Sequence, residues 1–157
     1  MDASLRLDIQ DLYTDYAACI DEGRFEEWPE FFTEKCDYKI IARENYDRGL
    51  PVSTLFFESK GMLKDRVYSI TKSLFHAPYY QRHIVSTPRF LKEEPDGSMR
   101  TEANYLVLRT RQNTLSEVFS TGRYVDVVMR ENGRLKFREK LCVFDSELIL
   151  NSIVYPL

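Results

Sequence analysis

The residues from which metal or acid–base chemistry would have to start are His76 and His83, the two histidines of the chain. Pro78 lies between them, and their spacing is neither the i, i+4 of a helical ligand pair nor the i, i+2 of a strand pair. A zinc site needs three or four ligands from Cys, His and carboxylate groups. The two histidines therefore do not predict a metal site by themselves.

Oxygen-activating iron centres require more imidazoles than this chain contains. A Rieske cluster takes two Cys and two His, and the facial triad of a mononuclear non-haem iron takes two further His and a carboxylate. Together the two centres need four histidines, and the chain has two. We therefore expect no such cofactors in this chain and no metal-ligating residues for them.

Motifs for nucleophilic or nucleotide-dependent chemistry are absent from the sequence. There is no G-x-S-x-G, no Cys next to a His, no G-x-G-x-x-G and no Walker A motif. An acid–base site is the enzymatic alternative, in which Asp21 and His83 would pair and Tyr38 or Asp126 would assist. The structural alternative is that Asp21 caps or solvates a helix end and that His83 is a hydrogen-bonded histidine beside Arg82.

Composition restricts the class of protein. The 157 residues correspond to one domain, residues 1–157, and 43% hydrophobic residues are enough for a packed core. A net charge of −3 without a basic face gives no reason to expect nucleic acid. No apolar run is long enough to span a membrane, and the first residues do not read as a signal peptide. Cys19, Cys36 and Cys142 are far apart, which favours free thiols and a cytoplasmic location.

The first half of the chain has mainly helical periodicity. Apolar residues follow one helical stripe over residues 5–20, with Asp2 or Ser4 as N-cap and Gly23 just past the end. The closing stretch "LILNSIVYPL" is apolar to its last residue, so we expect its own sheet or a neighbour to cover it. The other elements predicted in this half are a short helix at 25–32, strands at 36–42 and 54–59, a charged loop at 43–53, and a helix at 62–74.

The second half has strand periodicity. It predicts four long strands at 82–94, 99–111, 117–131 and 134–146, with turns at Pro95-Asp96-Gly97 and Asn132-Gly133. In the last strand, Leu135, Phe137, Leu141 and Val143 should lie on one face of the sheet, and Lys136, Arg138 and Lys140 on the other. We therefore predict an α+β fold in which a curled antiparallel sheet wraps around the N-terminal helices as a cone.

Several segments, taken in order, resemble one protein family. The more specific ones are Asp65-Arg66 in "GMLKDRVYSI", Arg82-His83 in "QRHIVSTPRF", the G-R-Y-x-D of "VFSTGRYVDVV" and the final P-L. Over residues 5–157 the chain resembles the small, or beta, subunit of bacterial aromatic-ring-hydroxylating oxygenases. The likeness is greatest to subunits that serve aromatic acids such as salicylate, benzoate, anthranilate or terephthalate, with a salicylate hydroxylase type as the narrowest expectation.

This resemblance implies a fold and a role. The fold would be the cone shared with nuclear transport factor two, ketosteroid isomerase and scytalone dehydratase. The large subunit of such an oxygenase holds the Rieske 2Fe-2S cluster and the mononuclear non-haem iron, and three large and three small subunits commonly assemble. The small subunit stabilises this assembly and in some members tunes substrate choice. The chain itself would then carry no catalytic centre.

Three hypotheses follow for the function. The first is a non-catalytic oxygenase subunit, the second is an independent dehydratase or isomerase that uses Asp21 and His83, and the third is a binding domain for a small apolar ligand. Under the first hypothesis, His83 and Arg82 form a structural or interface pair. The residues expected at subunit interfaces are Tyr46, Arg48, Tyr79, Tyr80, Arg82, His83 and Tyr155.

Overall fold

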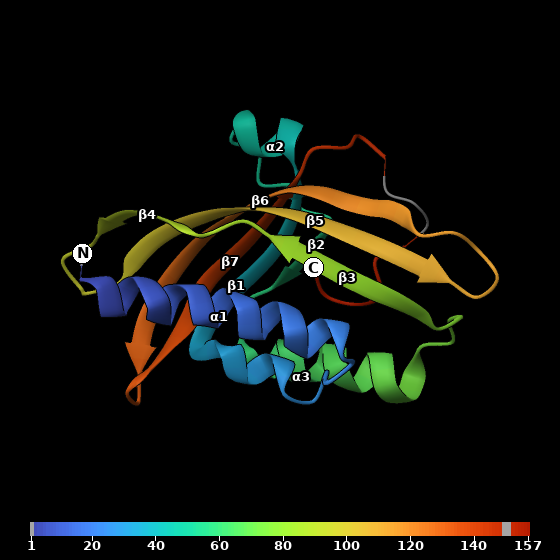
Figure 1. The fold of residues 1–157 in the computed structure, drawn as a ribbon, viewed down its shortest axis with the longest axis horizontal. Coiled ribbons are helices and arrows are strands. Elements are labelled where there is room, and N and C mark those ends of the chain that lie inside the picture. The colour runs from blue at the N-terminus through green and yellow to red at the C-terminus, as the bar shows by residue number, and fades with distance from the viewer. Residues whose placement is uncertain (1, 149–151) are drawn as a thin grey trace.

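A curled sheet lies over two helices in the computed structural model, which describes residues 2–148 and 152–157. Helices α1 (Ala3–Asp21) and α3 (Lys60–Tyr68) cover one side of the sheet, and the short α2 (Arg43–Asp47) lies on the other side (Figure 1). A 3₁₀ turn, η1 (Trp28–Phe31), follows α1, and a π-helical turn, η2 (Ser69–Ser73), extends α3. The predicted α+β class is confirmed.

The sheet is mixed rather than wholly antiparallel. Its order is β2-β1-β7-β6-β5-β3, with β4 paired to β5, and β1 runs parallel to β7 while the other pairs are antiparallel. The parallel pair joins the first-half strand to the last strand of the chain, so the two halves share one sheet. The strands are β1 (Phe32–Ala42), β2 (Leu55–Phe57), β3 (Tyr79–Val85), β4 (Arg89–Glu93), β5 (Met99–Arg111), β6 (Glu117–Glu131) and β7 (Arg134–Phe144).

Helix α1 forms where the apolar stripe predicted it. Its stripe side chains are buried against the inner face of the sheet, among them Ile9, Tyr13 and Ile20. Gly23 adopts a φ of +71° just past the helix, and its N–H donates to the Ile20 carbonyl. A left-handed glycine at this position ends the helix without a side-chain clash.

Both predicted turns are present. Asn132 and Gly133 have φ values of 52° and 79°, and two positive φ angles are what a type I′ hairpin requires. Gly97 has a φ of 78° in the turn between β4 and β5. The chemistry of these residues therefore sets two of the strand connections.

Several predicted elements were wrong in their bounds. The range 82–94 is two strands, because pairing with β5 is interrupted between Val85 and Arg89, where Pro88 cannot donate a backbone hydrogen bond. The predicted loop 43–53 begins with α2, and the strand predicted at 36–42 starts earlier, at Phe32. The helix predicted from residue 62 starts at Lys60, because the Ser59 hydroxyl accepts a hydrogen bond from the Met62 N–H.

The predicted faces of the last strand are correct only up to Arg138. The β6–β7 register passes from Val128↔Phe137 to Val127↔Glu139, so Arg138 is an extra residue that has no partner in this register. Such a bulge reverses which side chains face the core. Beyond it Lys140, which was predicted to share a face with Lys136 and Arg138, is instead buried in the core together with Cys142. Leu141 is only partly buried, and Val143 is buried outside the main core cluster.

The inward turn of Lys140 creates a buried ion pair. Its Nζ lies 3.0 Å from an Asp126 carboxylate oxygen, and both side chains are 0% exposed. The same Nζ lies 3.6 Å from the Tyr124 ring centroid and 4.2 Å from that of Phe137. Asp126 also accepts hydrogen bonds from the Tyr13 hydroxyl at 2.5 Å and the Leu141 N–H at 3.2 Å. Burial raises the pKa of the Asp126 carboxyl, and the nearby Lys140 opposes this shift.

We predict that Asp126→Ala strongly destabilises the fold, because it leaves the Lys140 ammonium buried without its counter-charge. The free energy of unfolding in urea should fall by about 3–5 kcal/mol. Arg138→Ala, which breaks the partly exposed 2.6 Å pair with Asp96, is the control and should cost about 1 kcal/mol or less. Equal small losses for the two variants would contradict this prediction.

Candidate functional site

Asp21 and His83, the predicted acid–base pair, are brought together by the fold. The His83 Nδ1 lies 2.6 Å from one Asp21 carboxylate oxygen, and the His83 backbone N–H donates to the other at 2.8 Å. Asp21 is the last residue of α1, and His83 lies in the middle of β3, the strand at one end of the sheet order. Both oxygens of the carboxylate thus bind the same residue, and the pair fastens the end of α1 to the edge of the sheet.

The geometry of this pair favours a structural role over catalysis. The His83 side chain is 0% exposed, and its Nε2 is buried without a hydrogen-bond partner among the described residues. A groove of about 380 Å³ runs between α1 and β3 and includes Asp21 and His83 in its lining. Because the imidazole itself is buried, a substrate in this groove would not reach a ring nitrogen.

The other two candidates for acid–base assistance lie in different clusters. Asp126 belongs to the ion pair with Lys140 described above. The Tyr38 hydroxyl accepts a hydrogen bond from the Leu157 N–H at 2.9 Å and donates to the Leu157 main-chain oxygen at 3.3 Å. Among the described residues, no hydrogen bond joins Asp126 or Tyr38 to His83, whose side chain and backbone N–H both bind Asp21. The four candidates therefore do not form one acid–base site.

The closing residues of the sequence occupy the interior of the cone. Leu157 is 0% exposed and packs in the main core cluster. Its main-chain oxygen accepts a 2.7 Å hydrogen bond from the Tyr16 hydroxyl. Burial raises the pKa of Tyr16 and Tyr38 well above the usual value, so both phenols stay protonated as donors. In Figure 1 the end of the chain lies between the sheet and the helices.

A second group of contacts holds the residues just before Leu157. The Arg66 guanidinium donates to the carbonyls of Ile153 and Val154 at 2.8 and 2.9 Å. The Tyr155 ring stacks on Phe25, with 4.8 Å between centroids. Its hydroxyl lies 3.0 Å from the His76 Nε2, so His76 takes part in a structural contact rather than a metal site.

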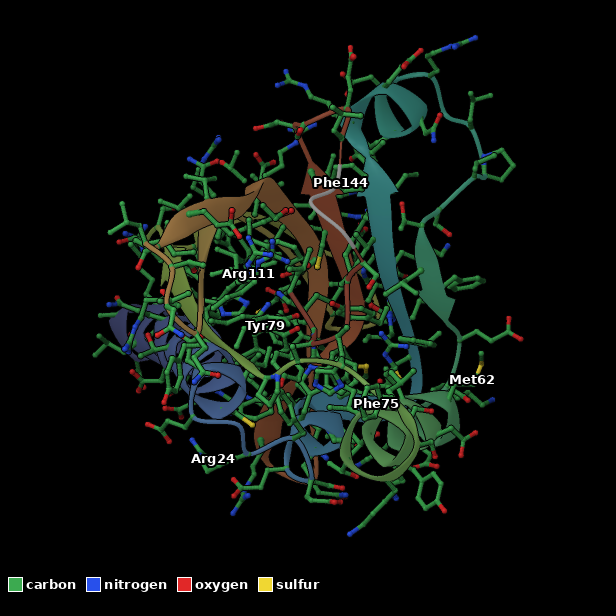
Figure 2. The ribbon with its side chains drawn as sticks, turned by 90° about the vertical axis from the view of Figure 1, so that its right-hand side faces the viewer. Arg24, Met62, Phe75, Tyr79, Arg111 and Phe144 are labelled. Carbon is green, nitrogen blue, oxygen red and sulfur yellow. The ribbon has the colours of Figure 1, made fainter. Side chains whose placement is uncertain are left out.

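Figure 2 looks along the sheet toward this end of the molecule, where side chains fill the space between sheet and helices and Tyr79 lies near the centre of the view. The Tyr79 ring centroid is 4.5 Å from that of Tyr155, and its hydroxyl accepts a hydrogen bond from the Tyr155 N–H at 3.4 Å. The chain's own interior thus covers residues 153–157 of the apolar closing stretch, whereas Ser152 and Leu148, the latter 80% exposed, are not covered. Residues 149–151 of that stretch lie outside the described residues.

The described residues contain no group of three or more His, Cys, Asp or Glu side chains that could hold a metal ion. The three cysteines are free and buried, and burial raises the pKa of Cys142 to about 12 and that of Cys19 and Cys36 to about 11. Thiols with such pKa values are mostly protonated at neutral pH and are poor nucleophiles. The described side chains therefore do not fit an iron centre or a thiolate nucleophile.

The residues predicted at interfaces divide into outward and inward groups. Tyr80 is 81% exposed, and Arg82, two residues further along the same face of β3, is also exposed. Arg48 is exposed and pairs with Glu44, whereas Tyr46 is half-buried under Arg123. The inward group is Tyr79, His83 and Tyr155, whose side chains contact other parts of this chain. Their contact with a partner stays a prediction.

Sequence reasoning missed the residues that hold the closing segment. Arg66 was noted only as part of a family-like D-R pair, and Tyr16 only as part of the α1 stripe. The signal that could have pointed to them is the apolar closing stretch itself, because its buried backbone carbonyls must find donors. Which donors they find depends on the tertiary fold.

Comparison with known proteins gives the family. The model of the family described as "Ring hydroxylating beta subunit" matches residues 16–151. The chain belongs to this family. It is 35% identical over 142 residues to the anthranilate 1,2-dioxygenase small subunit of Burkholderia cepacia, which spans 90% of this chain and 88% of that protein. It is 30% identical over 143 residues to a beta subunit of the terephthalate 1,2-dioxygenase terminal oxygenase component of Comamonas, over 90% of this chain and 92% of the relative.

Solved structures agree with this beta-subunit assignment. A beta subunit assigned to an aromatic-ring-hydroxylating dioxygenase of Novosphingobium aromaticivorans superposes with a TM-score of 0.85 at 33% identity, over 94% of this chain and 93% of that one. A protein from the same organism assigned as a scytalone dehydratase superposes with a TM-score of 0.67 at 16% identity, covering 88% and 82%. The second likeness concerns the fold alone, and it confirms the predicted cone.

The beta subunit is therefore a component of an oxygenase complex and has a large-subunit partner, as its family implies. No helix among the described residues of the beta subunit is long and apolar enough to cross a membrane.

We predict that Asp21→Asn weakens the attachment of α1 to β3 without unfolding the beta subunit. The amide cannot accept from the backbone N–H and the imidazole N–H of His83 as an anion does, and charge-assisted hydrogen bonds contribute about 1.5–3 kcal/mol. Chemical denaturation should show a loss of this order. Asp15→Asn, on the exposed face of the same helix, is the matched control and should change the free energy of unfolding by less than about 0.5 kcal/mol. If the two variants were equally stable, the attachment would not exist.

Proposed function

We propose that this chain is the non-catalytic small subunit of a cytoplasmic aromatic-ring-hydroxylating oxygenase. The Rieske 2Fe-2S cluster and the mononuclear non-haem iron lie in the large subunit, and three large and three small subunits form the complex. The small subunit stabilises this assembly and tunes its substrate choice. The observation that carries the proposal is that the cone interior, where a cone-shaped enzyme would bind its substrate, holds the chain's own residues 153–157.

The substrate of the complex is proposed to be an aromatic acid. Two relatives, at 35% and 30% identity, are named for anthranilate and terephthalate, which are both aromatic carboxylates. Salicylate and benzoate belong to the same chemical class, and a salicylate hydroxylase type remains our narrowest proposal. The small subunit would affect this choice only through its contact with the large subunit.

The interface is proposed to lie on two exposed parts of the chain. The first is the outer face of β3, where Tyr80 and Arg82 alternate with the buried Gln81 and His83. The second is the region of Tyr46 and Arg48, which continues into the exposed Leu50 and Val52. Aromatic and arginine side chains are enriched at the energetic centres of protein interfaces. Inward residues such as Tyr79, His83 and Tyr155 would support these surfaces from behind.

The dehydratase or isomerase alternative is less well supported. Asp21 leaves the His83 Nε2 free, but this ring nitrogen is buried, and the Tyr38 hydroxyl is engaged by Leu157. A general base must lie within hydrogen-bond reach of the substrate proton. A binding domain for a small apolar ligand meets the same obstacle, because Leu157 already packs in the core of the cone.

We predict that the purified chain contains no iron and does not oxidise aromatic acids by itself. Co-production with the large-subunit reading frame should give a hetero-oligomer that contains iron and hydroxylates an aromatic acid when an electron donor is supplied. Iron analysis, absorbance and product analysis of the two preparations check this. Turnover of salicylate or anthranilate by the chain without any companion protein would contradict the proposal.

We predict that Arg82→Ala weakens assembly with the large subunit. An exposed arginine at the centre of an interface contributes about 2 kcal/mol or more to binding. On a sizing column, the variant complex should therefore be dissociated at protein concentrations at which the unchanged complex is still assembled. Lys35→Ala removes another exposed positive charge and is the control, for which no change is expected. An unchanged assembly for Arg82→Ala would remove this residue from the interface.

A further inference from the structure

The backbone of the closing segment, residues 153–157, is bound by side chains rather than by a neighbouring strand. Arg66 donates to the carbonyls of Ile153 and Val154, at 2.8 and 2.9 Å. The Leu157 main-chain oxygen accepts from the Tyr16 hydroxyl at 2.7 Å. None of the residues 152–157 belongs to a helix or a strand. These contacts are of the kind by which a receptor binds an extended peptide.

Two backbone N–H groups of the segment are also satisfied by side chains. The Leu157 N–H donates to the Tyr38 hydroxyl at 2.9 Å, and the Tyr155 N–H donates to the Tyr79 hydroxyl at 3.4 Å. The donors and acceptors therefore come from α1, β1, α3 and β3, four elements that surround the segment. Main-chain recognition of this kind gives affinity that depends little on the peptide's side chains.

Side-chain packing would give the site its selectivity. Leu157 is 0% exposed in the main core cluster. The Tyr155 ring lies between Phe25 and Tyr79, with centroid distances of 4.8 and 4.5 Å. Pro156 is buried between these two anchors. Leu157 and Pro156 are thus buried and Tyr155 is stacked, each in its own part of the site, so the site should select peptides with these residue types at this spacing.

Two of the side chains that bind the segment are also held by contacts that do not involve it. The Tyr16 ring packs edge-on against Phe137 at 5.4 Å, and Tyr38 packs edge-on against Trp28 at 5.3 Å. Residues that are fixed before binding lose little conformational entropy on binding. Tyr16 and Tyr38 are therefore positioned to receive the segment by the rest of the core.

From these observations we propose that the interior of the cone is a peptide-binding site. Its ligand is a short segment of the type Ile-Val-Tyr-Pro-Leu, which the chain's own residues 153–157 supply, and the same site accepts this peptide from a separate molecule when its own segment is displaced. The proposal does not depend on the oxygenase assembly.

The test uses the full chain with Leu157→Asp. A carboxylate is not tolerated in an apolar core without a partner, so the segment of this variant should leave the site. A synthetic peptide of residues 152–157, SIVYPL, should then bind saturably in calorimetry and raise the thermal unfolding midpoint by roughly 3 °C at a tenfold excess over Kd. The unchanged full chain should not bind it, because its own segment has a millimolar effective concentration.

Matched variants separate specific binding from general stickiness. In the Leu157→Asp background, Arg66→Ala should weaken peptide binding roughly tenfold or more, because it removes charged hydrogen bonds to two carbonyls. Tyr68→Phe, which changes an exposed tyrosine at the end of α3, should leave the affinity unchanged. The peptide SIVYPD should bind at least tenfold more weakly than SIVYPL.

The outcomes decide the proposal in each case. A folded Leu157→Asp chain that does not bind SIVYPL would overturn the proposal. Peptide binding that Arg66→Ala does not weaken would overturn it as well. If the variant does not fold alone, the peptide should restore the native circular dichroism spectrum, and failure to do so would count against the site. None of these results bears on whether the chain assembles with a large subunit.

Discussion

The structure depends most on the pairing of backbone groups that the closing segment carries into the cone. A buried carbonyl or N–H without a partner costs free energy comparable to a lost hydrogen bond. Residues 153–157 can therefore lie in the core only where side chains provide hydrogen-bond donors and acceptors for their backbone. Arg66, Tyr16 and Tyr38 meet this requirement from three different elements. These contacts connect α1, α3 and β1 through the closing segment. The site that holds the segment is therefore part of the hydrophobic core of the cone.

The buried pair of Lys140 and Asp126 illustrates a second constraint on the same core. Tyr13 of α1 donates to Asp126 of β6, which in turn binds Lys140 of β7, so that one polar cluster joins the first helix to two central strands. A buried charge pair does not by itself add stability over an apolar core. It does require these elements to meet in one arrangement, and the rings of Tyr124 and Phe137 complete the enclosure of the ammonium.

Local sequence patterns determined the parts of the fold that depend on neighbouring residues. The apolar stripe of α1, the left-handed Gly23 and the Asn132-Gly133 turn could be predicted, because periodicity and turn chemistry are local. The bulge at Arg138 could not, since it appears only in the pairing of β7 with β6, and it reversed the predicted side of Lys140. The pairing of Asp21 with His83 was foreseen as an alternative, but not that both carboxylate oxygens would serve one residue. The buried position of residues 153–157 depends on hydrogen-bonding side chains from distant parts of the chain, and no local sequence pattern predicts such contacts.

A small subunit that supports an oxygenase without taking part in its chemistry should tolerate the loss of its Asp21–His83 pair. This can be measured as the turnover, per bound iron, of the assembled complex with Asp21→Asn in the small subunit. The turnover per iron should equal that of the unchanged complex, because Asp21 acts on His83 within the fold. Loss of an acid–base group lowers a rate by roughly 10²–10⁴-fold. A loss of that size, in a complex whose iron content and size are intact, would show that the small subunit takes part in the reaction.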